Sequence, residues 1–323
     1  MRAIQFEQTG GPEVLQLVEV ETPKPGPGQV LIRNQAIGVN FIETYQRGGL
    51  YPVKLPSGLG GEGAGVVEAV GDGVTRFKVG DLGAYAGGVM GSYAEYVVVA
   101  ADRVVKPPPG IDARVAAAAL LKGLTVEAFI RRLYPVKAGE TVLVHAAAGG
   151  VGQIMVQWLK AIGAEVIATV GSEEKAELVR GLGADHVILY RDQDVAAEVK
   201  RITGGKGVPV AYDSVGKDTF EGTLGSLARR GWFVSFGNAS GPVPPVDPLR
   251  LMRGGSLVFT RPTLFDYAST TEELDASAAA LFEMIASGKV KIEIGQTFRL
   301  AEARKAHEAL ESRATVGASL LIP

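Results

Sequence analysis

The sequence predicts an α/β protein in which a doubly wound parallel sheet is joined to a β-rich unit. In the first third of the chain, short runs rich in Val, Ile and Ala alternate with turn clusters such as Pro23–Gly28. From about Leu120 onward, continuous apolar runs alternate with helical patterns, as expected for parallel strands buried on both faces. The length of 323 residues indicates two domains, at roughly 150 residues per domain.

Five strands and one short helix are expected in the β-rich part. Gly and Pro separate the apolar runs, and short strands with frequent turns are typical of a compact antiparallel barrel. The strands are expected at residues 1–6, 15–20, 29–39, 65–70 and 94–99, and the helix at 40–47.

Six strands are expected in the α/β part, which fits a doubly wound fold. Apolar residues of segment 150–162 recur at helical spacing, whereas segments 141–146 and 165–170 are short continuous apolar runs. The remaining strands are expected at 186–190, 208–213, 232–237 and 256–260, and the remaining helices at 172–182, 194–202 and 218–227.

The C-terminal segment returns to a mixed pattern. We expect it to pack on the β-rich part, so that the α/β part is an insertion. The expected domains are therefore 1–122, 123–261 and 262–323, the first and last forming one unit. Within the last segment, helices are expected at 271–287 and 301–312, and strands near 290–298 and at 318–322.

The composition excludes several classes of function. The formal net charge is −2, from 33 Lys and Arg and 35 Asp and Glu, which argues against nucleic acid as a partner. The chain has no cysteine, which excludes disulfides, thiolate metal ligands and cysteine nucleophiles. No apolar stretch approaches the roughly 20 residues of a membrane span, and the N-terminus lacks an apolar signal region. We therefore expect a soluble cytoplasmic protein with no membrane partner.

The segment His145-Ala-Ala-Ala-Gly-Gly-Val-Gly-Gln153 has the pattern of a dinucleotide-binding turn. It follows an expected strand and opens an expected helix, with Ala147, Gly149 and Gly152 at the three glycine positions of the fingerprint. Gly149 would let the backbone approach a pyrophosphate, and Gly152 would let the helix pack closely on the strand. Alanine fits the first position if its φ is negative. The alternative is a tight turn without a ligand, but the flanking strand, helix and downstream sheet favour a nucleotide site.

The tip of the second strand indicates which dinucleotide would bind. A NAD site usually has Asp or Glu there, about 20 residues after the glycine turn. Here the strand ends in Gly171 and Ser172, Lys175 follows, and Tyr190 ends the next strand. A small neutral tip with a nearby cation accommodates the 2′-phosphate of NADPH. The two glutamates before Lys175 could turn inward, but they also fit a solvated first helical turn. The sequence therefore favours NADPH.

Five further motifs accompany the glycine turn, in chain order: Gly38-Val-Asn-Phe-Ile-Glu-Thr-Tyr45, Leu121-Lys-Gly-Leu-Thr-Val126, Tyr212-Asp-Ser-Val-Gly216, Val234-Ser-Phe-Gly-Asn238 and Leu310-Glu-Ser-Arg-Ala-Thr315. Together with the glycine turn they resemble bacterial members of the quinone oxidoreductase/ζ-crystallin family. That family belongs to the zinc-independent medium-chain dehydrogenases/reductases, and the resemblance covers nearly the whole chain. It implies a GroES-like catalytic domain with a Rossmann domain inserted before its C-terminal part.

No metal site is predicted. Zinc alcohol dehydrogenases of the same superfamily carry a Gly-His-Glu motif, whereas the matching segment here reads Gly60-Gly-Glu-Gly63. The histidines, His145, His186 and His307, are scattered, and a catalytic zinc needs about three converging protein ligands. We interpret His145 as a structural, hydrogen-bonded residue at a strand end.

The resemblance also implies the residues of an active site. Asn40, Tyr45 and Tyr51 are expected as catalytic residues where nicotinamide and substrate meet. Asn40 would contact the cofactor or polarise a carbonyl, and the tyrosines would form an aromatic wall or donate hydrogen bonds. The alternatives are a turn residue for Asn40 and ordinary packing for the tyrosines. Besides Asn40, the expected cofactor-binding residues are Thr125, Gly149, Gly150, Val151, Gly152, Gly171, Ser172, Lys175, Tyr190, Ser214, Phe236, Gly237, Asn238, Ser240, Thr260, Pro262 and Arg313.

The available side chains narrow the reaction. Without zinc, alcohol oxidation lacks its usual electrophile, whereas reduction of an activated acceptor needs a hydride donor, an oriented pocket and a few hydrogen bonds. The resemblance implies NADPH-dependent, zinc-independent hydride transfer to quinones or related conjugated carbonyls. Two alternatives stay open: reduction of the C=C bond of enoyl or alkenal substrates, and a non-catalytic RNA-binding or structural role. The resemblance also implies a homodimer paired through the edge strand from Ser256 to Thr260, since exposed apolar edges seek partners.

Overall fold

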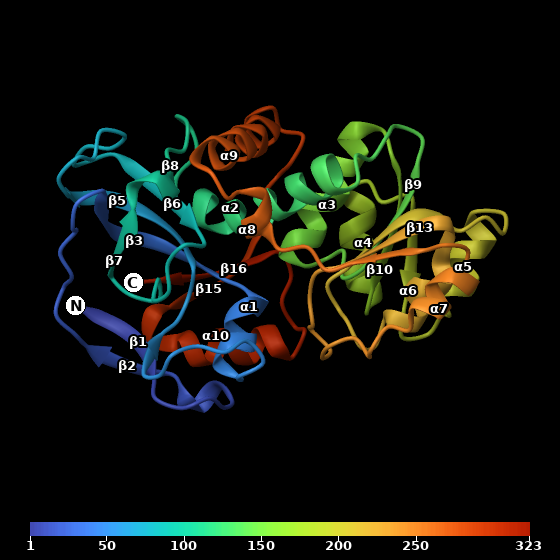
Figure 1. Cartoon of the computed structure of the whole chain (residues 1–323), viewed down its shortest axis with the longest axis horizontal. Helices are drawn as coiled ribbons and strands as arrows, with labels where there is room; N and C mark the ends of the chain where they lie inside the picture. The colour runs from blue at the N-terminus through green and yellow to red at the C-terminus, as the bar shows by residue number, and fades with distance from the viewer. The chain divides into compact units, whose positions relative to one another are not determined.

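The computed structural model describes residues 1–323, and the chain forms two compact units (Figure 1). Unit 1 comprises Met1–Leu124, Ala268–Ser287 and Ile292–Pro323, and unit 2 comprises Thr125–Tyr267 and Gly288–Lys291. Unit 1 is therefore assembled from segments on both sides of unit 2 in the sequence. The sequence had predicted the changes of domain at residues 122 and 261.

Unit 1 is organised around the long strand β3 (Gln29–Val39). This strand pairs antiparallel with β5 (Glu62–Val70), β7 (Tyr96–Ala100) and β16 (Ala318–Ile322). Because β16 comes from the C-terminal segment, the end of the chain completes the sheet that the first third begins. The sheet has seven strands. Six of them run in the order β15-β16-β3-β5-β6-β8, and β7 pairs with β3 outside this order. The strands not yet given are β15 (Ile294–Arg299), β6 (Leu82–Ala86) and β8 (Val104–Val105).

A second, three-stranded sheet and several helices complete unit 1. The sheet has the order β2-β1-β4. One apolar cluster buries Phe6, Leu59, Tyr93 and Leu321 together, so that residues from both ends of the chain share a core. The remaining elements are β1 (Arg2–Phe6), β2 (Gln16–Glu19), β4 (Ser57–Gly58), α1 (Phe41–Arg47), α9 (Thr271–Ala286), α10 (Ala303–Glu311) and the first part of α2 (Ala113–Glu127), with short 3-10 turns at Pro12–Val14, Ala101–Arg103 and Leu300–Glu302.

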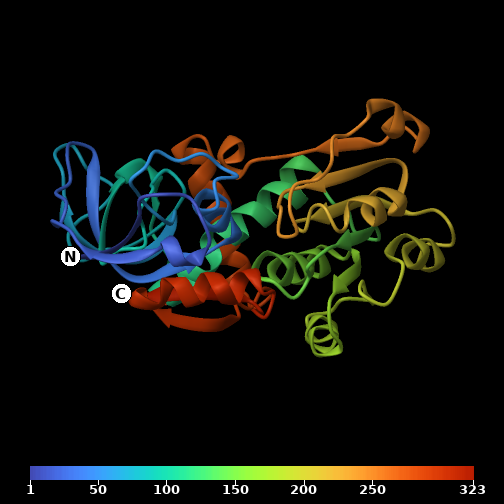
Figure 2. The same ribbon diagram turned by 90° about the horizontal axis from the view of Figure 1, so that it is seen from below.

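Unit 2 contains a six-stranded parallel sheet with the order β11-β10-β9-β12-β13-β14 (Figure 2). Counted from β9, this order is 3-2-1-4-5-6, as in dinucleotide-binding doubly wound sheets, and it reverses between β9 and β12. The predicted fold class is confirmed. The strands are β9 (Thr141–Val144), β10 (Glu165–Val170), β11 (His186–Leu189), β12 (Val208–Asp213), β13 (Leu227–Ser235) and β14 (Val258–Thr260).

Helices connect successive strands of this sheet. The helix after β9, α3 (Gly150–Ile162), ends at Gly163, whose φ of +92° places it in the left-handed region that favours glycine. The core beneath the helices buries Leu143, Ile167 and Phe233. The other helices are α4 (Glu173–Gly181), α5 (Val195–Ile202), α6 (Phe220–Ser226), α7 (Pro248–Arg253) and α8 (Leu264–Tyr267).

The sequence analysis missed α2 and the π-helical turn that follows it, Ala128–Leu133. Residues 116–120 of α2 are completely buried. A helix surrounded by protein shows no apolar stripe beside a polar face, and that stripe is the pattern by which helices are predicted. Strand β6 was missed as well, and β13 begins at Leu227, earlier than the predicted residue 232.

Candidate active site

The glycine-rich turn of unit 2 joins β9 to α3. Gly149 is the N-cap residue of α3, with φ −78° and ψ 173°, and no side chain caps the helix. The first backbone N–H groups of α3, from Gly150 and Val151 onward, are therefore oriented to bind an anion. A Cβ on Gly152 would lie 2.4 Å from Ala146 O and 2.6 Å from Ala147 Cα, so the helix packs on the turn at a distance only glycine permits.

Ala147 occupies the first glycine position of the fingerprint without strain. The left-handed conformation falls one residue earlier, at Ala146, whose φ is +50°, and Ala147 is not among the residues with positive φ. The methyl group of Ala147 therefore costs little, as expected from the sequence. The turn retains the shape and the donors that a pyrophosphate requires.

The tip of β10 carries no carboxylate, and two side chains pack over it. A Cβ on Gly171 would lie 2.8 Å from Tyr190 Oη and 3.4 Å from Arg191 Nε, so a larger residue there would have to displace these two side chains. Ser172 is the N-cap residue of α4, and its hydroxyl accepts a hydrogen bond from the backbone N–H of Lys175 at 3.4 Å. The predicted residues Gly171, Ser172, Lys175 and Tyr190 therefore come together at one strand tip.

Two positive charges lie near this tip. Burial lowers the pKa of the Lys175 ammonium, Tyr190 opposes the shift, and the nearby Arg191 guanidinium lowers the pKa further. A cation destabilised by burial and by a second positive charge gains stability from a bound anion. Sequence reasoning missed Arg191, although it directly follows Tyr190 and could have been found from that position.

The loops that follow β12 and β13 lie against each other. A Cβ on Gly237 would lie 2.2 Å from Ser214 O, so these two predicted residues are in backbone contact. The Ser240 hydroxyl donates to Val215 O at 2.9 Å and accepts from Asp218 N at 2.9 Å. Ser240 thus ties the two loops together, and its contact with a cofactor remains a prediction.

A basic residue missed by sequence reasoning holds the loop after β13. Arg261 Nη1 donates to Ser235 Oγ at 3.1 Å and to Gly237 O at 2.9 Å, and Arg261 Nη2 lies 3.1 Å from the Asn238 amide oxygen. Arg261 stands between the predicted residues Thr260 and Pro262. Arg261 therefore fixes the loop that contains Phe236. The Phe236 ring packs edge-on against Phe129, with ring centroids 5.4 Å apart.

The three predicted catalytic residues lie in one short segment of unit 1. Asn40 directly follows β3 and is the N-cap residue of α1, Tyr45 lies on that helix, and Tyr51 follows it. The rings of Tyr45 and Tyr51 are 5.4 Å apart and meet edge to face. Asn40 Nδ2 donates to Glu62 Oε2 at 2.9 Å, which fixes the orientation of its amide.

A buried acidic cluster adjoins Asn40, and sequence reasoning missed it. The completely buried Glu62 carboxylate also accepts from Leu121 N at 2.7 Å and from Lys122 Nζ at 3.1 Å. Glu43 accepts from the backbone N–H of Asn40 at 2.5 Å, and its Oε1 is buried without a hydrogen-bond partner. Burial raises the pKa of Glu43 to about 8, and the charge of Glu62 adds to the increase. Glu62 forms an ion pair with Lys122, whereas the raised pKa of Glu43 favours its protonated form at neutral pH.

The two remaining predicted residues lie in different units. Thr125 is the first residue of unit 2 and lies in α2, whereas Arg313 follows α10 in unit 1 with a φ of +59°. Their approach to a cofactor stays a prediction.

Comparison with known proteins identifies the family. The family model described as "Alcohol dehydrogenase GroES-like domain" matches residues 26–109, and the one described as "Zinc-binding dehydrogenase" matches residues 150–283. A quinone oxidoreductase of Pseudomonas aeruginosa is 54% identical over 323 residues, which are 100% of this chain and 99% of that protein. The chain belongs to the quinone oxidoreductase family. The solved structure of the Escherichia coli quinone oxidoreductase complexed with NADPH has a TM-score of 0.98 at 49% identity, with 100% of each chain covered. A 2-haloacrylate reductase of a Burkholderia species is 42% identical over 331 residues, which cover 99% of this chain and 98% of that protein.

The second family model refers to zinc, but this member of the quinone oxidoreductase family has no cluster of side chains for a metal. No group of three or more His, Cys, Asp or Glu residues could hold a metal ion. Each histidine contacts other protein groups: His145 contacts two threonines, His186 contacts Glu165, and His307 contacts Arg47 and Tyr93. None of the helices has the length and apolar character needed to cross a membrane.

Proposed function

We propose that this protein is an NADPH-dependent, zinc-independent quinone reductase that acts on quinones or related conjugated carbonyls. The observation that carries the proposal is the pairing of an uncapped α3 N-terminus with a β10 tip that has no carboxylate at Gly171 or Ser172 and has Lys175, Tyr190 and Arg191 close to it. Relatives support it, since the quinone oxidoreductase of Escherichia coli was solved with NADPH.

The cofactor would be held along the carboxyl ends of the strands of unit 2. The turn from Gly149 to Gly152 would bind the pyrophosphate, and Lys175, Tyr190 and Arg191 would bind the 2′-phosphate, together with the predicted Arg313. When bound, NADPH supplies the hydride. The nicotinamide side would be lined by the predicted residues Thr125, Ser214, Phe236, Gly237, Asn238, Ser240, Thr260 and Pro262.

The substrate would be oriented by the residues of unit 1. Tyr45 and Tyr51 offer a paired aromatic surface to a planar conjugated acceptor, and their hydroxyl groups can hydrogen-bond its oxygen. Asn40 holds a fixed amide beside them because Glu62 binds its Nδ2. These residues would exclude water and hold the acceptor in place, and orientation of this kind lowers the barrier to hydride transfer.

Reduction of a C=C bond beside a carbonyl is the second candidate activity, because the chain is 42% identical to a 2-haloacrylate reductase. The two tyrosine rings could contact either acceptor. The two are distinguished by initial rates of NADPH oxidation with 1,4-benzoquinone and with a small enone at matched concentrations. We expect the quinone to give the higher kcat/KM, and a preference for the enone would replace the proposed activity by alkenal reduction.

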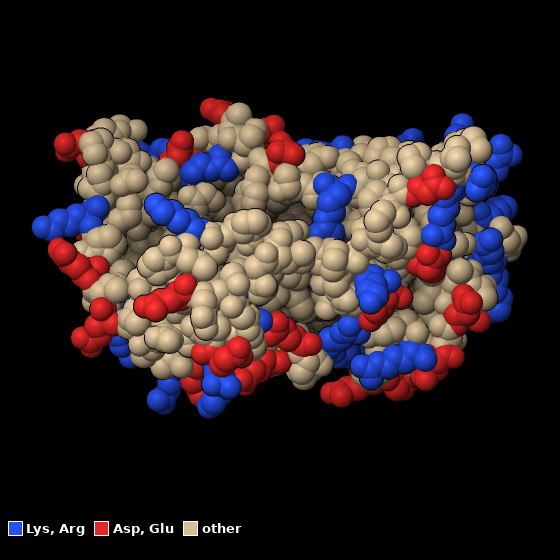
Figure 3. Space-filling view, turned by 60° about the horizontal axis from the view of Figure 1, so that its bottom comes forward, with Lys and Arg blue, Asp and Glu red and all other residues tan.

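A non-catalytic role in RNA binding finds little support in the charge balance of the chain. Phosphate-backbone binding is driven by basic charge, whereas this chain has a formal net charge of −2. On the face shown in Figure 3, acidic and basic side chains both occur, and basic ones predominate at the right-hand edge. From the charge balance we propose that the protein has no nucleic-acid partner. We also propose that it functions in the cytoplasm.

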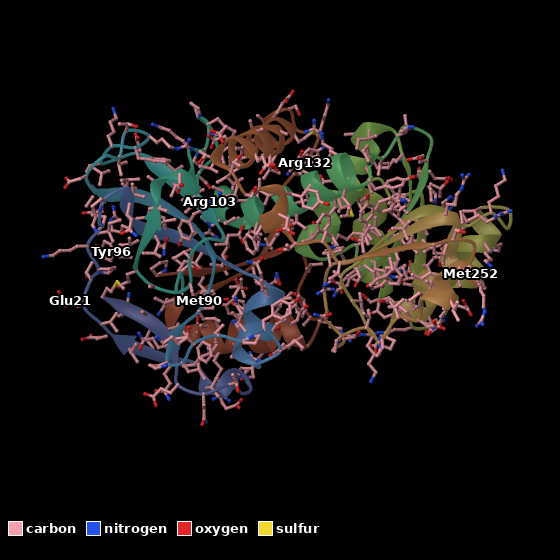
Figure 4. All side chains as sticks on the ribbon, in the orientation of Figure 1. Glu21, Met90, Tyr96, Arg103, Arg132 and Met252 are labelled. Atoms are coloured by element: carbon pink, nitrogen blue, oxygen red, sulfur yellow. The ribbon has the colours of Figure 1, made fainter.

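We further propose a homodimer formed through the edge of the unit 2 sheet. Strand β14 is the last strand of that sheet and pairs only with β13. The adjacent helix α7 exposes 53% of Leu249 and 59% of Met252, the latter labelled in Figure 4. An open strand edge beside exposed apolar side chains favours pairing with a second copy. Analytical ultracentrifugation of M252E, which places a charge on the exposed apolar face of α7, should show monomers where the wild type shows dimers, and a monomeric wild type would overturn the proposal.

A further inference from the structure

His145 lies at the end of β9, directly before the glycine-rich turn, and is almost completely buried. Its Nδ1 lies 3.0 Å from Thr169 Oγ1 on β10, and its Nε2 lies 2.9 Å from Thr223 Oγ1 on α6. Its backbone N–H donates to Tyr212 O on the neighbouring strand β12. The imidazole therefore connects two strands of the sheet and a covering helix beneath the proposed cofactor site.

The hydrogen-bond partners determine the tautomer of His145. Thr223 Oγ1 lies 2.7 Å from Asp213 Oδ2, and a carboxylate is the strongest acceptor within reach of its single proton. Thr223 therefore donates to Asp213 and accepts from His145, so Nε2 carries the proton. Nδ1 then accepts from the Thr169 hydroxyl. Burial lowers the pKa of His145, with the charge of Asp213 opposing the shift, so the ring is neutral.

The Asp213 carboxylate is the other end of this network and shapes the turn after β12. It is completely buried and accepts from Val215 N at 2.8 Å and from Gly216 N at 3.1 Å. The hydroxyl groups of Thr219 and Thr223 each donate to its second oxygen at 2.7 Å. The carboxylate thus fixes the backbone around Ser214, which contacts Gly237 in the next loop.

The network acts at the point in the sheet where a dinucleotide would lie. Strands β9 and β12 are neighbours, and the strand order reverses between them, which is where doubly wound sheets bind ligands. Apolar side chains of similar volume would stabilise a sheet at least as well as a buried carboxylate. The polar network adds hydrogen bonds that fix the positions of two turns. His145 adjoins the glycine turn, and Asp213 binds the backbone of the turn that contains Ser214.

We propose that His145 and Asp213, joined through Thr223, are positioning residues that hold the turns after β9 and β12 at the separation that bound NADPH spans. This proposal rests on the proposed function, because it takes NADPH to be the ligand. Neither residue contacts the reacting atoms, so their effect is expected in cofactor affinity.

The test compares T223V, which removes the hydroxyl at nearly constant volume, with T223S, which keeps it. The dissociation constants of NADPH and of 2′-AMP, which lacks the pyrophosphate and the nicotinamide, are measured by fluorescence quenching, and circular dichroism checks folding. We expect the Kd for NADPH to rise about tenfold in T223V, because the bond lost is to a charged group, and to stay within about twofold in T223S. The Kd for 2′-AMP should not change in either variant.

A Kd for NADPH in T223V close to that of the wild type would overturn the inference. An equal rise in the Kd values for NADPH and 2′-AMP would also overturn it, because it would indicate that the whole of unit 2 is less ordered. T169V provides a second test if T223V does not fold, because it removes the donor to Nδ1 and leaves all the bonds to Asp213 in place. The Kd for NADPH should rise several-fold in T169V and stay unchanged in T169S. A wild-type protein that binds no NADPH would instead contradict the proposed function.

Discussion

Replacing the two glycines of the β9–α3 turn by alanine separates cofactor binding from folding. Gly149 has φ −78° and ψ 173°, which any residue adopts, and a Cβ there would meet only Ala146 O at 3.3 Å. In Gly152 a Cβ would lie 2.4 to 2.7 Å from three backbone atoms of the turn. Backbone atoms cannot rotate away as a flexible side chain can, so G149A and G152A should behave differently.

The magnitudes follow from these contacts. At position 149 alanine restricts the unfolded chain, whereas the 3.3 Å contact with Ala146 O and the loss of a glycine N-cap act in the opposite direction. The free energy of unfolding should therefore stay within about 1 kcal/mol of the wild-type value. The new methyl group would lie where the backbone approaches the pyrophosphate, so we expect the Kd for NADPH to rise at least about tenfold, or 1.4 kcal/mol. At position 152 the overlap should lower the free energy of unfolding by about 1–3 kcal/mol, exceeding the helix preference for alanine of about 1 kcal/mol.

Urea unfolding and NADPH titration of the wild type and both variants measure these effects. G149A should be as stable as the wild type and bind weakly, whereas G152A should be destabilised. If G149A bound NADPH as tightly as the wild type, the turn would not hold the pyrophosphate and the reasoning would be refuted. An undiminished stability of G152A would refute the packing argument.

Three further predictions follow from the electrostatics. In a binding titration, K175Q should raise the Kd for NADPH by roughly 10–100-fold and leave the Kd for NADH unchanged, because it removes a charged partner of the 2′-phosphate. An equal rise in both Kd values would contradict this. Urea unfolding of K122M should show a free energy of unfolding lower by about 3–5 kcal/mol, because the buried Glu62 carboxylate loses its ion-pair partner. The exposed Lys106, which pairs with Asp81, provides the control. K106M should lower the free energy of unfolding by at most about 1 kcal/mol. Because folding raises the pKa of Glu43 from 4.5 to about 8, the folded state binds its proton more tightly, and stability is lost as pH rises between these values, by up to about 1.4 kcal/mol per unit. The wild type should therefore lose stability relative to E43Q as pH rises over this range, because glutamine does not titrate. A difference in the free energy of unfolding that is independent of pH would contradict a neutral Glu43.

The sequence predicted the elements whose patterns are local. The helix over residues 150–162 and the strands over 165–170 and 29–39 were predicted with their observed bounds, because their apolar periodicity continues over the whole element. The glycine turn could be found because strand, turn and helix are adjacent in the sequence. The grouping of Lys175 with Tyr190 followed from the expected ends of two successive strands, and the structure brings both to the tip of β10.

Residues whose roles depend on distant contacts could not be found in this way. Glu62 entered the prediction only as part of Gly60–Gly63, where glycine replaces the histidine of the zinc motif. Its role was missed because the partners that define it, Leu121 and Lys122, lie 59 and 60 residues further along the chain. The contact between His145 and Thr223 spans 78 residues, and Arg261 reaches back 24 residues to Gly237. Single-sequence patterns contain no information about such pairs, so these buried polar networks become visible only in the folded chain.

The central claim is that the β10 tip selects NADPH for the reduction of quinones without a metal. The most direct measurement is kcat/KM for NADPH and for NADH with 1,4-benzoquinone as acceptor, after treatment of the protein with a chelator. We expect rapid turnover that survives the chelator and a kcat/KM for NADPH far above that for NADH. A preference for NADH, or activity lost with the chelator and restored by zinc, would contradict it.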